Sequence, residues 1–388
     1  MIDVELKKWA TPRQAEYIDA VIEHGSNNKA AKALGVTRRT IDKGIVRVRE
    51  LAAIRGYSPD HDMTRPVPDT HIAKGVSTYY NKEGKVTGQW VKSSLDDEKL
   101  QAAKRAAMEA LAEELPRVRP VAGPKRTLVA DLCNLYTLTD SHVGMLAWRK
   151  EGGDDWDMKI AERTLTECFE HMVMHSPPAA TCVVNQLGDF LHWDGIAPVT
   201  PTSGHIVDAD GRFSKMVAVA IRILRRVVDF ALSRHEHVIV LLAEGNHDMA
   251  SSVWLRHMFK AIYESEPRIT VIDSELPYYT YQHGETMLAF HHGHLRKNDQ
   301  LPLLFAAQFP KMWGSTQKRY AHTGHRHHVD EREHSGMIVH QHATLAARDA
   351  YAARGGWLAE RKVTAMTYHS KFGEVARTTV TPEMMAEA

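Results

Sequence analysis

The chain has 388 residues, with 49 Lys and Arg balanced by 48 Asp and Glu, only 3 Cys, and 24 His. Its length predicts two or three domains, and its 43% hydrophobic residues exclude a chain that is disordered over most of its length. No apolar run approaches the roughly 18 residues of a membrane helix, and the N-terminal segment lacks the apolar block of a secretory signal. We therefore expect a cytoplasmic protein with no membrane partner. The three Cys show no C-x-x-C spacing, so any metal should be held by His and carboxylates.

Charge and His are distributed unevenly along the chain. Residues 1–126 carry 23 Lys and Arg against 17 Asp and Glu, whereas residues 127–388 carry 26 against 31 and hold 21 of the 24 His. Proline-rich stretches near residues 59–68 and 116–124 mark the same division. The sequence therefore predicts a basic domain over 1–56, a linker region over 57–126 and a His-rich domain over 127–388.

The linker region should contain a hairpin followed by a helix. Strand-like residues at 78–80 and 85–91 flank the turn sequence Asn-Lys-Glu-Gly at 81–84. A helix should begin after Ser94, since Asp97 follows at capping distance, with an apolar stripe formed by Leu100, Ala103, Ala107 and Leu111.

Residues 12–56 are typical of three short helices, with Ser26 and Thr37 as N-caps of the second and third. The turn A-x-x-L-G-V-T between them, around Gly35, resembles the helix-turn-helix of bacterial and phage DNA-binding domains. In such a domain the third helix enters the major groove, and its outward cations contact DNA. Here those cations would be Arg38, Arg39, Lys43 and Arg47. The alternative is a small helical bundle that binds a protein partner.

From residue 127 onward, apolar strand-like runs alternate with amphipathic helix-like runs, which is the pattern of an α/β domain. The strand-like runs are 132–138, 181–185, 237–243, 287–290, 337–339, 364–368 and 375–380. The helix-like runs are 159–171, 213–233 and 252–264. Ligands in such folds bind at loops that follow the carboxyl ends of strands.

Potential metal ligands follow five strand ends in succession. The motifs are Asp140-Ser141-His142, Gly188-Asp189, Gly245-Asn246-His247-Asp248, His291-His292-Gly293-His294 and Gly324-His325-Arg326-His327-His328. Imidazole and carboxylate together suit Mn, Fe and Zn. Two such ions, about 3.5–4 Å apart, can clamp a phosphoryl group and activate water.

The set D-x-H, G-D, G-N-H-D, H-G-H and G-H-x-H resembles the calcineurin-like metallophosphoesterases over about residues 130–345. The N-terminal helix-turn-helix joined to such a domain is similar to phage-type phosphoesterases. The resemblance implies an α/β fold, a four-layer β-sandwich flanked by helices, preceded by a small all-α helix-turn-helix domain. It also implies two divalent transition metal ions, with Mn favoured and Fe, Zn or Ni as alternatives.

The resemblance implies a role for each motif residue. Asp140, His142 and His327 would hold one metal, Asn246, His292 and His325 the second, and Asp189 would bridge both. A hydroxide between the metals would attack phosphorus. His247 would protonate the leaving oxygen, with Asp248 orienting its ring. His192 and His294 are expected to support a ligand or to contact the substrate.

The expected function is a two-metal phosphodiesterase, and the basic N-terminal domain favours DNA as its substrate, hence a nuclease. One alternative is a phosphatase or cyclic-nucleotide phosphodiesterase whose N-terminal domain binds a protein. Another is a DNA-binding regulator with an inactive phosphoesterase domain.

Overall fold

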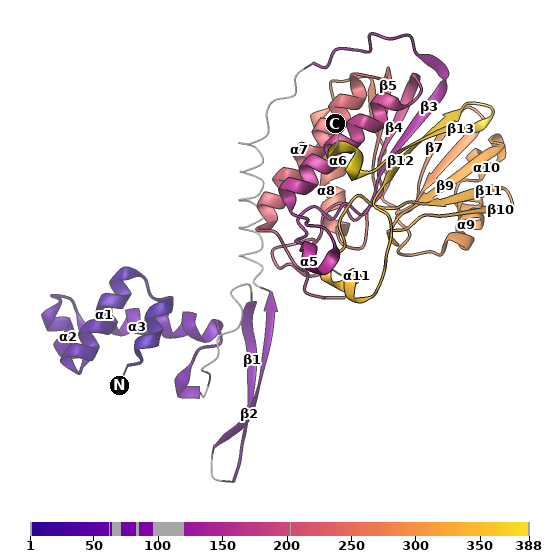
Figure 1. The fold of residues 1–388 in the computed structure, drawn as a ribbon. Coiled ribbons are helices and arrows are strands. Elements are labelled where there is room, and N and C mark those ends of the chain that lie inside the picture. Colours follow the sequence, from indigo (N-terminus) through magenta and orange to yellow (C-terminus); the bar gives the residue numbers. More distant parts are fainter. Residues whose placement is uncertain are drawn as a thin grey trace. The chain divides into compact units, whose positions relative to one another are not determined.

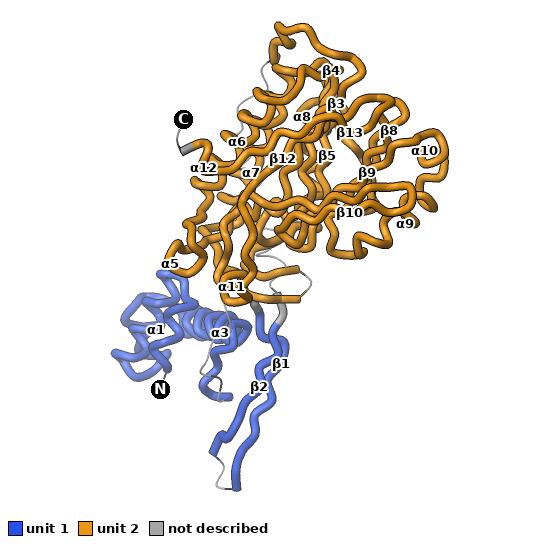
Figure 2. Tube along the Cα trace, turned by 45° about the vertical axis from the view of Figure 1, so that its right-hand side comes forward, with its two compact units in different colours: residues 1–103 blue, residues 104–388 orange. Residues whose placement is uncertain are grey.

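The computed structural model describes residues 2–61, 63, 71–82, 85–95, 120–201 and 203–386. The chain divides into two compact units, Met1–Ala103 and Lys104–Ala388 (Figure 2). This division lies inside the region assigned to the linker, and the boundaries near residues 57 and 126 stay predictions. The helix expected after Ser94 lies outside the described residues. In the described part of the chain, no helix combines the length and apolar character needed to cross a membrane.

Three helices form the first part of unit 1, after a short 3-10 helix at Val4–Trp9 (Figure 1). They are α1 (Pro12–His24), α2 (Asn27–Ala33) and α3 (Arg38–Ile54). The hydroxyls of Ser26 and Thr37 accept hydrogen bonds from the first turns of α2 and α3, as the capping pattern predicted. Buried side chains from all three helices, among them Ala30 and Ile41, form a small apolar core.

A hairpin follows the helices in unit 1, after a 3-10 turn at Pro59–His61. Strands β1 (His71–Tyr80) and β2 (Val86–Leu95) pair in antiparallel register, which confirms the predicted hairpin.

Unit 2 contains two sheets. The six-stranded sheet has the order β13-β12-β3-β4-β5-β6, and the five-stranded sheet has the order β10-β11-β9-β8-β7. The first is built from β3 (Val129–Leu138), β4 (Ala179–Gln186), β5 (His237–Leu242), β6 (Ile269–Val271), β12 (Val363–His369) and β13 (Gly373–Val380). The second is built from β7 (Tyr279–His283), β8 (Thr286–Phe290), β9 (Lys318–Thr323), β10 (Asp330–His334) and β11 (Met337–Gln341).

The two faces of the six-stranded sheet pack against different partners, and neighbouring residues along a strand point to opposite faces. In β3, Cys133 and Leu135 pack with Leu288 and Phe290 of the other sheet, whereas Tyr136 packs into a core with the helices. That helical face is covered by α6 (Met158–His175), α7 (Phe213–Leu232) and α8 (Met249–Ile262).

The outer face of the five-stranded sheet is covered by α9 (Leu301–Gln308) and α10 (Pro310–Ser315) (Figure 1). Unit 2 is therefore a mixed α/β structure of four layers: helices, sheet, sheet and helices. The other short helices in its described residues are α5 (Arg149–Gly152), η3 (Asn298–Gln300), α11 (Ala350–Arg354) and α12 (Pro382–Ala386).

Strand register brings the motif loops to one edge of the sandwich. Leu138, Gln186 and Leu242 are paired across the parallel strands β3, β4 and β5. Phe290 and His322 pair in the same way at the ends of β8 and β9. Because parallel strands end together, all five motifs follow strands at the same edge.

Candidate metal centre

The motif loops are fixed to one another by backbone hydrogen bonds. The N–H groups of Asp140 and His142 donate to the carbonyls of Gly188 and Asp189, at 3.1 and 3.0 Å. In the other sheet, the N–H of Gly324 donates to the carbonyl of His292 at 2.8 Å. These backbone hydrogen bonds thus fix the positions from which the side chains of the loops extend.

Three groups of possible metal ligands lie at this edge in the described part of the chain; one of them, His142, His192 and His247, has no carboxylate, whereas each of the other two has one. Asp140, His142 and His327 offer ligand atoms within 4.8 Å of one another, and Asp189, His292 and His325 do the same. The groups touch, since Nε2 of His292 lies 3.1 Å from Asp189 Oδ2 and 3.8 Å from Asp140 Oδ1. The first group has the residues that the resemblance implies for one metal, and the second joins two ligands implied for the other metal, His292 and His325, to the expected bridge Asp189.

Asp140 and Asp189 are both buried, with side chains 0% and 2% exposed. Asp140 accepts hydrogen bonds from the hydroxyl of Thr139 at 2.7 Å and from the backbone N–H of His325 at 2.8 Å. Among the described residues, neither carboxylate forms an ion pair with a Lys or Arg. Buried charges are normally paired or bound to metals, so this pair favours cation binding.

The protonation of the four imidazoles follows from their positions. Burial lowers the pKa of His142 and that of His325, so both are neutral and able to donate a lone pair to a metal. Burial would also lower the pKa of His292, but Asp189 and Asp140 outweigh it and raise that pKa to about 10. Asp140 raises the pKa of His327 in the same way, against the effect of its burial. Without metal, protons on His292 and His327 supply the positive charge that the carboxylates require.

Backbone strain is concentrated at the same residues. Among the described residues, those other than Gly with positive φ are Asp140, His142, Asp189, His325 and His327, with φ between 42° and 69°. Residues with a side chain adopt this conformation at a cost of about 1–3 kcal/mol, and such strain gathers at functional sites. All five belong to the two ligand sets.

Unpartnered buried atoms give a further test of fit to a metal. The Oδ1 atom of Asn246 is buried with no hydrogen-bond partner, and Nε2 of His292 has no partner apart from the carboxylates of Asp189 and Asp140. The Nδ1–H of His292 donates to the carbonyl of Leu187 at 2.8 Å, which leaves Nε2 to act as a ligand. A divalent transition metal would satisfy these atoms, and the donor set of Asp, His and Asn fits it.

Of the three His in the fourth motif, His291, His292 and His294, the contacts support only His292 as a ligand. His291 donates from Nδ1 to the carbonyl of Pro277 at 2.9 Å, and it belongs to neither ligand group. His294 is half-buried at the border of the site, with its ring 5.3 Å from that of His292 and 6.3 Å from that of His325. His292 alone of the three lies against the carboxylates.

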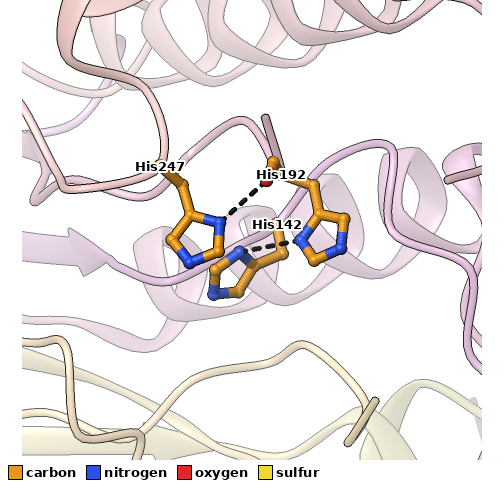
Figure 3. Close-up of side chains that lie close together, drawn as sticks. All are labelled: His142, His192 and His247. Atoms are coloured by element: carbon orange, nitrogen blue, oxygen red, sulfur yellow. Dashed lines mark hydrogen bonds between the residues drawn. The ribbon is translucent and has the colours of Figure 1, made fainter. Parts of the chain in front are cut away.

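His247 lies beside His142 and His192 (Figure 3). Its Nδ1–H donates to the main-chain carbonyl of His192 at 2.8 Å, so its Nε2 is free. Its ring centroid is 4.8 Å from that of His142. The orientation of His247 therefore comes from a carbonyl.

Asp248 does not orient His247, contrary to the role expected from the sequence. Its Oδ2 accepts the N–H groups of Phe190 and Leu191 at 2.7 and 3.1 Å, and its Oδ1 accepts that of Gly245 at 2.9 Å. Asp248 thus ties the loop after β4 to the loop after β5. Burial and the negative charge of Asp189 raise its pKa to about 7.

His192 contacts the site through both its backbone and its ring. Its Nδ1 lies 3.3 Å from Nδ1 of His142 (Figure 3). The Nε2 of His142 in turn lies 3.4 Å from Nε2 of His327. Burial lowers the pKa of His192 to about 3, so its neutral ring can accept a hydrogen bond at Nδ1 from the Nδ1–H of His142. That hydrogen bond leaves the lone pair of His142 on Nε2, toward the other ligands.

Supporting groups that the motifs did not reveal are Thr139, Thr344 and the carbonyls of Leu187 and His192. The hydroxyl of Thr344 donates to the carbonyl of Asp140 at 2.7 Å. Thr139 is adjacent in sequence to a ligand, and that position was the one available signal. Backbone carbonyls carry no signal in the sequence.

The four cations predicted to contact DNA lie in unit 1. Arg38, Arg39, Lys43 and Arg47 are exposed on α3, where Arg38 pairs with Asp42 at 3.4 Å and Arg47 with Glu50 at 3.1 Å. Such exposed pairs contribute little energy and can open for a phosphate.

Metal binding should release protons and tighten as pH rises. His292 is protonated below its pKa of about 10, so a cation that binds at Nε2 must displace that proton. Calorimetric Mn titration at pH 7 in two buffers of different ionisation enthalpy should show release of about one proton or more per chain. Heats that do not depend on the buffer would contradict this assignment.

Gly245 should tolerate no side chain, because a Cβ there would lie 2.0 Å from Oδ1 of Asp189 and 2.2 Å from its backbone nitrogen. Gly245→Ala should therefore displace Asp189, weaken Mn binding and lower Tm by roughly 2–8 °C. Gly195→Ala is the matched control, since a Cβ at Gly195 meets no atom within 4 Å. Equal melting temperatures and Mn affinities for the two variants would refute the tight contact.

Comparison with known proteins gives structural likeness only. No family model and no curated protein matches the sequence. Among solved structures, the phosphoesterase YfcE from E. coli is 14% identical with a TM-score of 0.32, and the match covers 63% of this chain and 98% of that one. An archaeal phosphodiesterase is 12% identical with a TM-score of 0.33, covering 64% and 99%. Vps29 with zinc from Entamoeba histolytica is 13% identical with a TM-score of 0.26, covering 64% and 99%. TM-scores this low add nothing to what the geometry of the site shows.

Proposed function

We propose that unit 2 is a metal-dependent phosphoesterase of the calcineurin-like type that uses two divalent ions, with Mn favoured over Fe, Zn or Ni. The observation that carries this proposal is the contact between two His and carboxylate groups around Asp140 and Asp189. Both carboxylates are buried, and no described Lys or Arg neutralises them.

Different residues of the site would bind the metal ions and act on the phosphoester. Divalent ions held by such a donor set polarise phosphoryl oxygens and lower the pKa of water. The two ligand groups and Asn246 would hold these ions. His247 keeps a proton on Nδ1 through the carbonyl of His192, so its Nε2 can stabilise a phosphoryl oxygen or protonate the leaving oxygen. The hydrogen bond between His192 and His142 holds a ligand ring in place.

We infer that the phosphoester is in DNA, which makes the protein a phosphodiesterase or nuclease. The support is the exposed cluster of cations on α3, the third helix of the predicted helix-turn-helix domain. The test is incubation in Mn with labelled single-stranded, duplex and nicked DNA, beside nucleotides and phosphopeptides. Cleavage of DNA is expected, whereas hydrolysis confined to nucleotides or phosphopeptides would overturn the choice of substrate.

DNA binding by α3 should depend steeply on salt. Arg39 and Lys43 form no ion pair with a described carboxylate, so Arg39→Ala/Lys43→Ala should weaken binding to duplex DNA and reduce the slope of log K against log salt by about 2. The control is Lys7→Ala/Arg13→Ala, which removes two cations of the same unit outside α3. An unchanged slope in the α3 variant, measured by fluorescence anisotropy, would contradict DNA contact by this helix.

A further inference from the structure

Two short helices flank the metal centre on segments that lead directly from it. Helix α5 begins at Arg149, seven residues after His142, and α11 begins at Ala350, six residues after Thr344. Thr344 donates its hydroxyl hydrogen bond to the carbonyl of Asp140 at 2.7 Å. Both helices therefore belong to segments that lead away from the metal centre.

The two helices lie side by side (Figures 1 and 2). A Cβ at Gly152 of α5 would lie 2.3 Å from the carbonyl oxygen of Arg348, just before α11. The segments around α5 and α11 thus form one continuous surface.

Exposed aromatic rings are concentrated on this surface. Trp148 is 56% exposed, Tyr351 is 73% exposed and Trp357 is 56% exposed. The rings of Tyr351 and Trp357 are edge to face, with centroids 5.2 Å apart. In the described part of unit 2, only one other aromatic side chain, Phe372, is counted among the exposed large hydrophobic residues. Rings of this size are normally buried, so their exposure here calls for a partner.

Cations are neighbours of these rings, one by a cation–π contact and two in the sequence. Lys150 places Nζ 5.2 Å from the ring centre of Trp148. Arg348 and Arg354 flank Tyr351 in the sequence, and none of these three cations pairs with a described carboxylate. Of the two helices, only α5 carries a carboxylate, Glu151.

The other nearby acidic groups are already engaged. Asp154 pairs with Arg361 at 3.0 Å, and Asp155 pairs with Arg149 at 3.6 Å. Asp349 caps α11 by accepting the N–H of Ala352 at 2.8 Å. The three unpaired cations therefore outnumber the two nearby described carboxylates without an ion pair, Glu151 and Asp349.

We propose that this aromatic surface, formed by Trp148, Lys150, Arg348, Tyr351, Arg354 and Trp357, binds a single-stranded segment of DNA beside the metal centre. Unpaired bases expose π faces that stack on aromatic rings, while phosphates are neutralised by the interspersed cations. A duplex hides those faces. The exposed Leu146 and Leu358 lie next to the rings in the sequence, but the unpaired cations beside the rings favour a phosphate backbone over an apolar protein surface. The proposal rests on the proposed function, since it assigns the form of the DNA strand.

The test measures binding of the full chain to fluorescein-labelled dT20 and to a duplex of equal length, in EDTA, by anisotropy. Tyr351→Ala/Trp357→Ala should weaken dT20 binding about tenfold or more, because each stacked base contributes substantially, with little change for the duplex. Trp357→Phe should retain most of the affinity, because it keeps a ring.

The matched control is Phe372→Ala. Phe372 is 67% exposed in the turn between β12 and β13, and the pairing of His369 with Leu132 places this turn at the opposite edge of the sheet from the metal centre. Phe372→Ala should leave dT20 binding unchanged.

Three results would overturn the proposal: unchanged dT20 affinity in the double variant, equal weakening for the duplex, or tighter binding of U20 RNA, measured in the same assay, than of dT20. Dimerisation that the double variant abolishes, with dT20 binding intact, would assign the surface to a second copy.

Hydrolysis of bis(p-nitrophenyl) phosphate by the unaltered protein in Mn is measured separately. Its absence rejects the proposed function, whereas activity combined with unchanged dT20 binding rejects the aromatic surface alone.

Discussion

Asp189→Asn is expected to abolish Mn-dependent hydrolysis of bis(p-nitrophenyl) phosphate, with a loss of about a thousandfold or more. Asn preserves the size of the side chain but removes the negative charge. Asp189 uses one oxygen to accept the backbone N–H of His247 at 2.8 Å and places the other 3.1 Å from Nε2 of His292. The substitution thus removes the negative charge that attracts cations. The amide oxygen of Asn can still accept the hydrogen bond from the N–H of His247.

Asp229→Asn provides the matched control for this loss. Asp229 is a half-buried carboxylate on α7 that accepts a hydrogen bond from the hydroxyl of Tyr263 at 2.7 Å, and it touches none of the metal ligands. It should keep full activity. Wild-type turnover by Asp189→Asn, in protein with an unchanged Tm, would contradict a shared carboxylate at the site.

His247→Ala should reduce turnover by about a hundredfold to ten-thousandfold while Mn binding is retained. His247 belongs to neither of the two ligand sets, and its Nδ1–H is held by the carbonyl of His192. If its main task is to protonate the leaving oxygen, the loss should be larger for a thymidine dinucleotide than for bis(p-nitrophenyl) phosphate, because nitrophenolate leaves without a proton.

His328→Ala is the control for His247→Ala. His328 is exposed, and its Nδ1 also donates to a carbonyl, that of Arg326, at 2.8 Å. It should leave turnover of both substrates unchanged. An equal loss with the two substrates in His247→Ala would refute proton donation, and a loss of bound Mn would make His247 a ligand instead.

The sequence predicts the site well where ligands follow strands of strong apolar character. Strands β3, β4, β5 and β8 were expected close to their observed bounds, and their parallel register places the following motifs together. The role of Asp248 could not be predicted in the same way. Its hydrogen-bond partners are three backbone N–H groups, which the sequence does not reveal. The sequence instead suggested the adjacent His247 as its partner.

The elements that the sequence analysis missed lack periodic patterns. Strand β10, with the sequence Asp-Glu-Arg-Glu-His, has no apolar alternation and forms by pairing with β11 at the edge of the sheet. Helix α9 is apolar on most sides, and it covers the outer face of the second sheet through Leu301 and Phe305. Long-range pairing, rather than local preference, determines these elements.

Titration of the metal-free protein with Mn, followed by electron paramagnetic resonance, tests the central claim most directly. The two groups around Asp140 and Asp189 are in contact through His292. Two ions per chain, with the spectrum of a magnetically coupled pair, are expected because the ions would share a carboxylate. A single ion per chain, or two ions that are magnetically independent, would contradict a dinuclear metal centre.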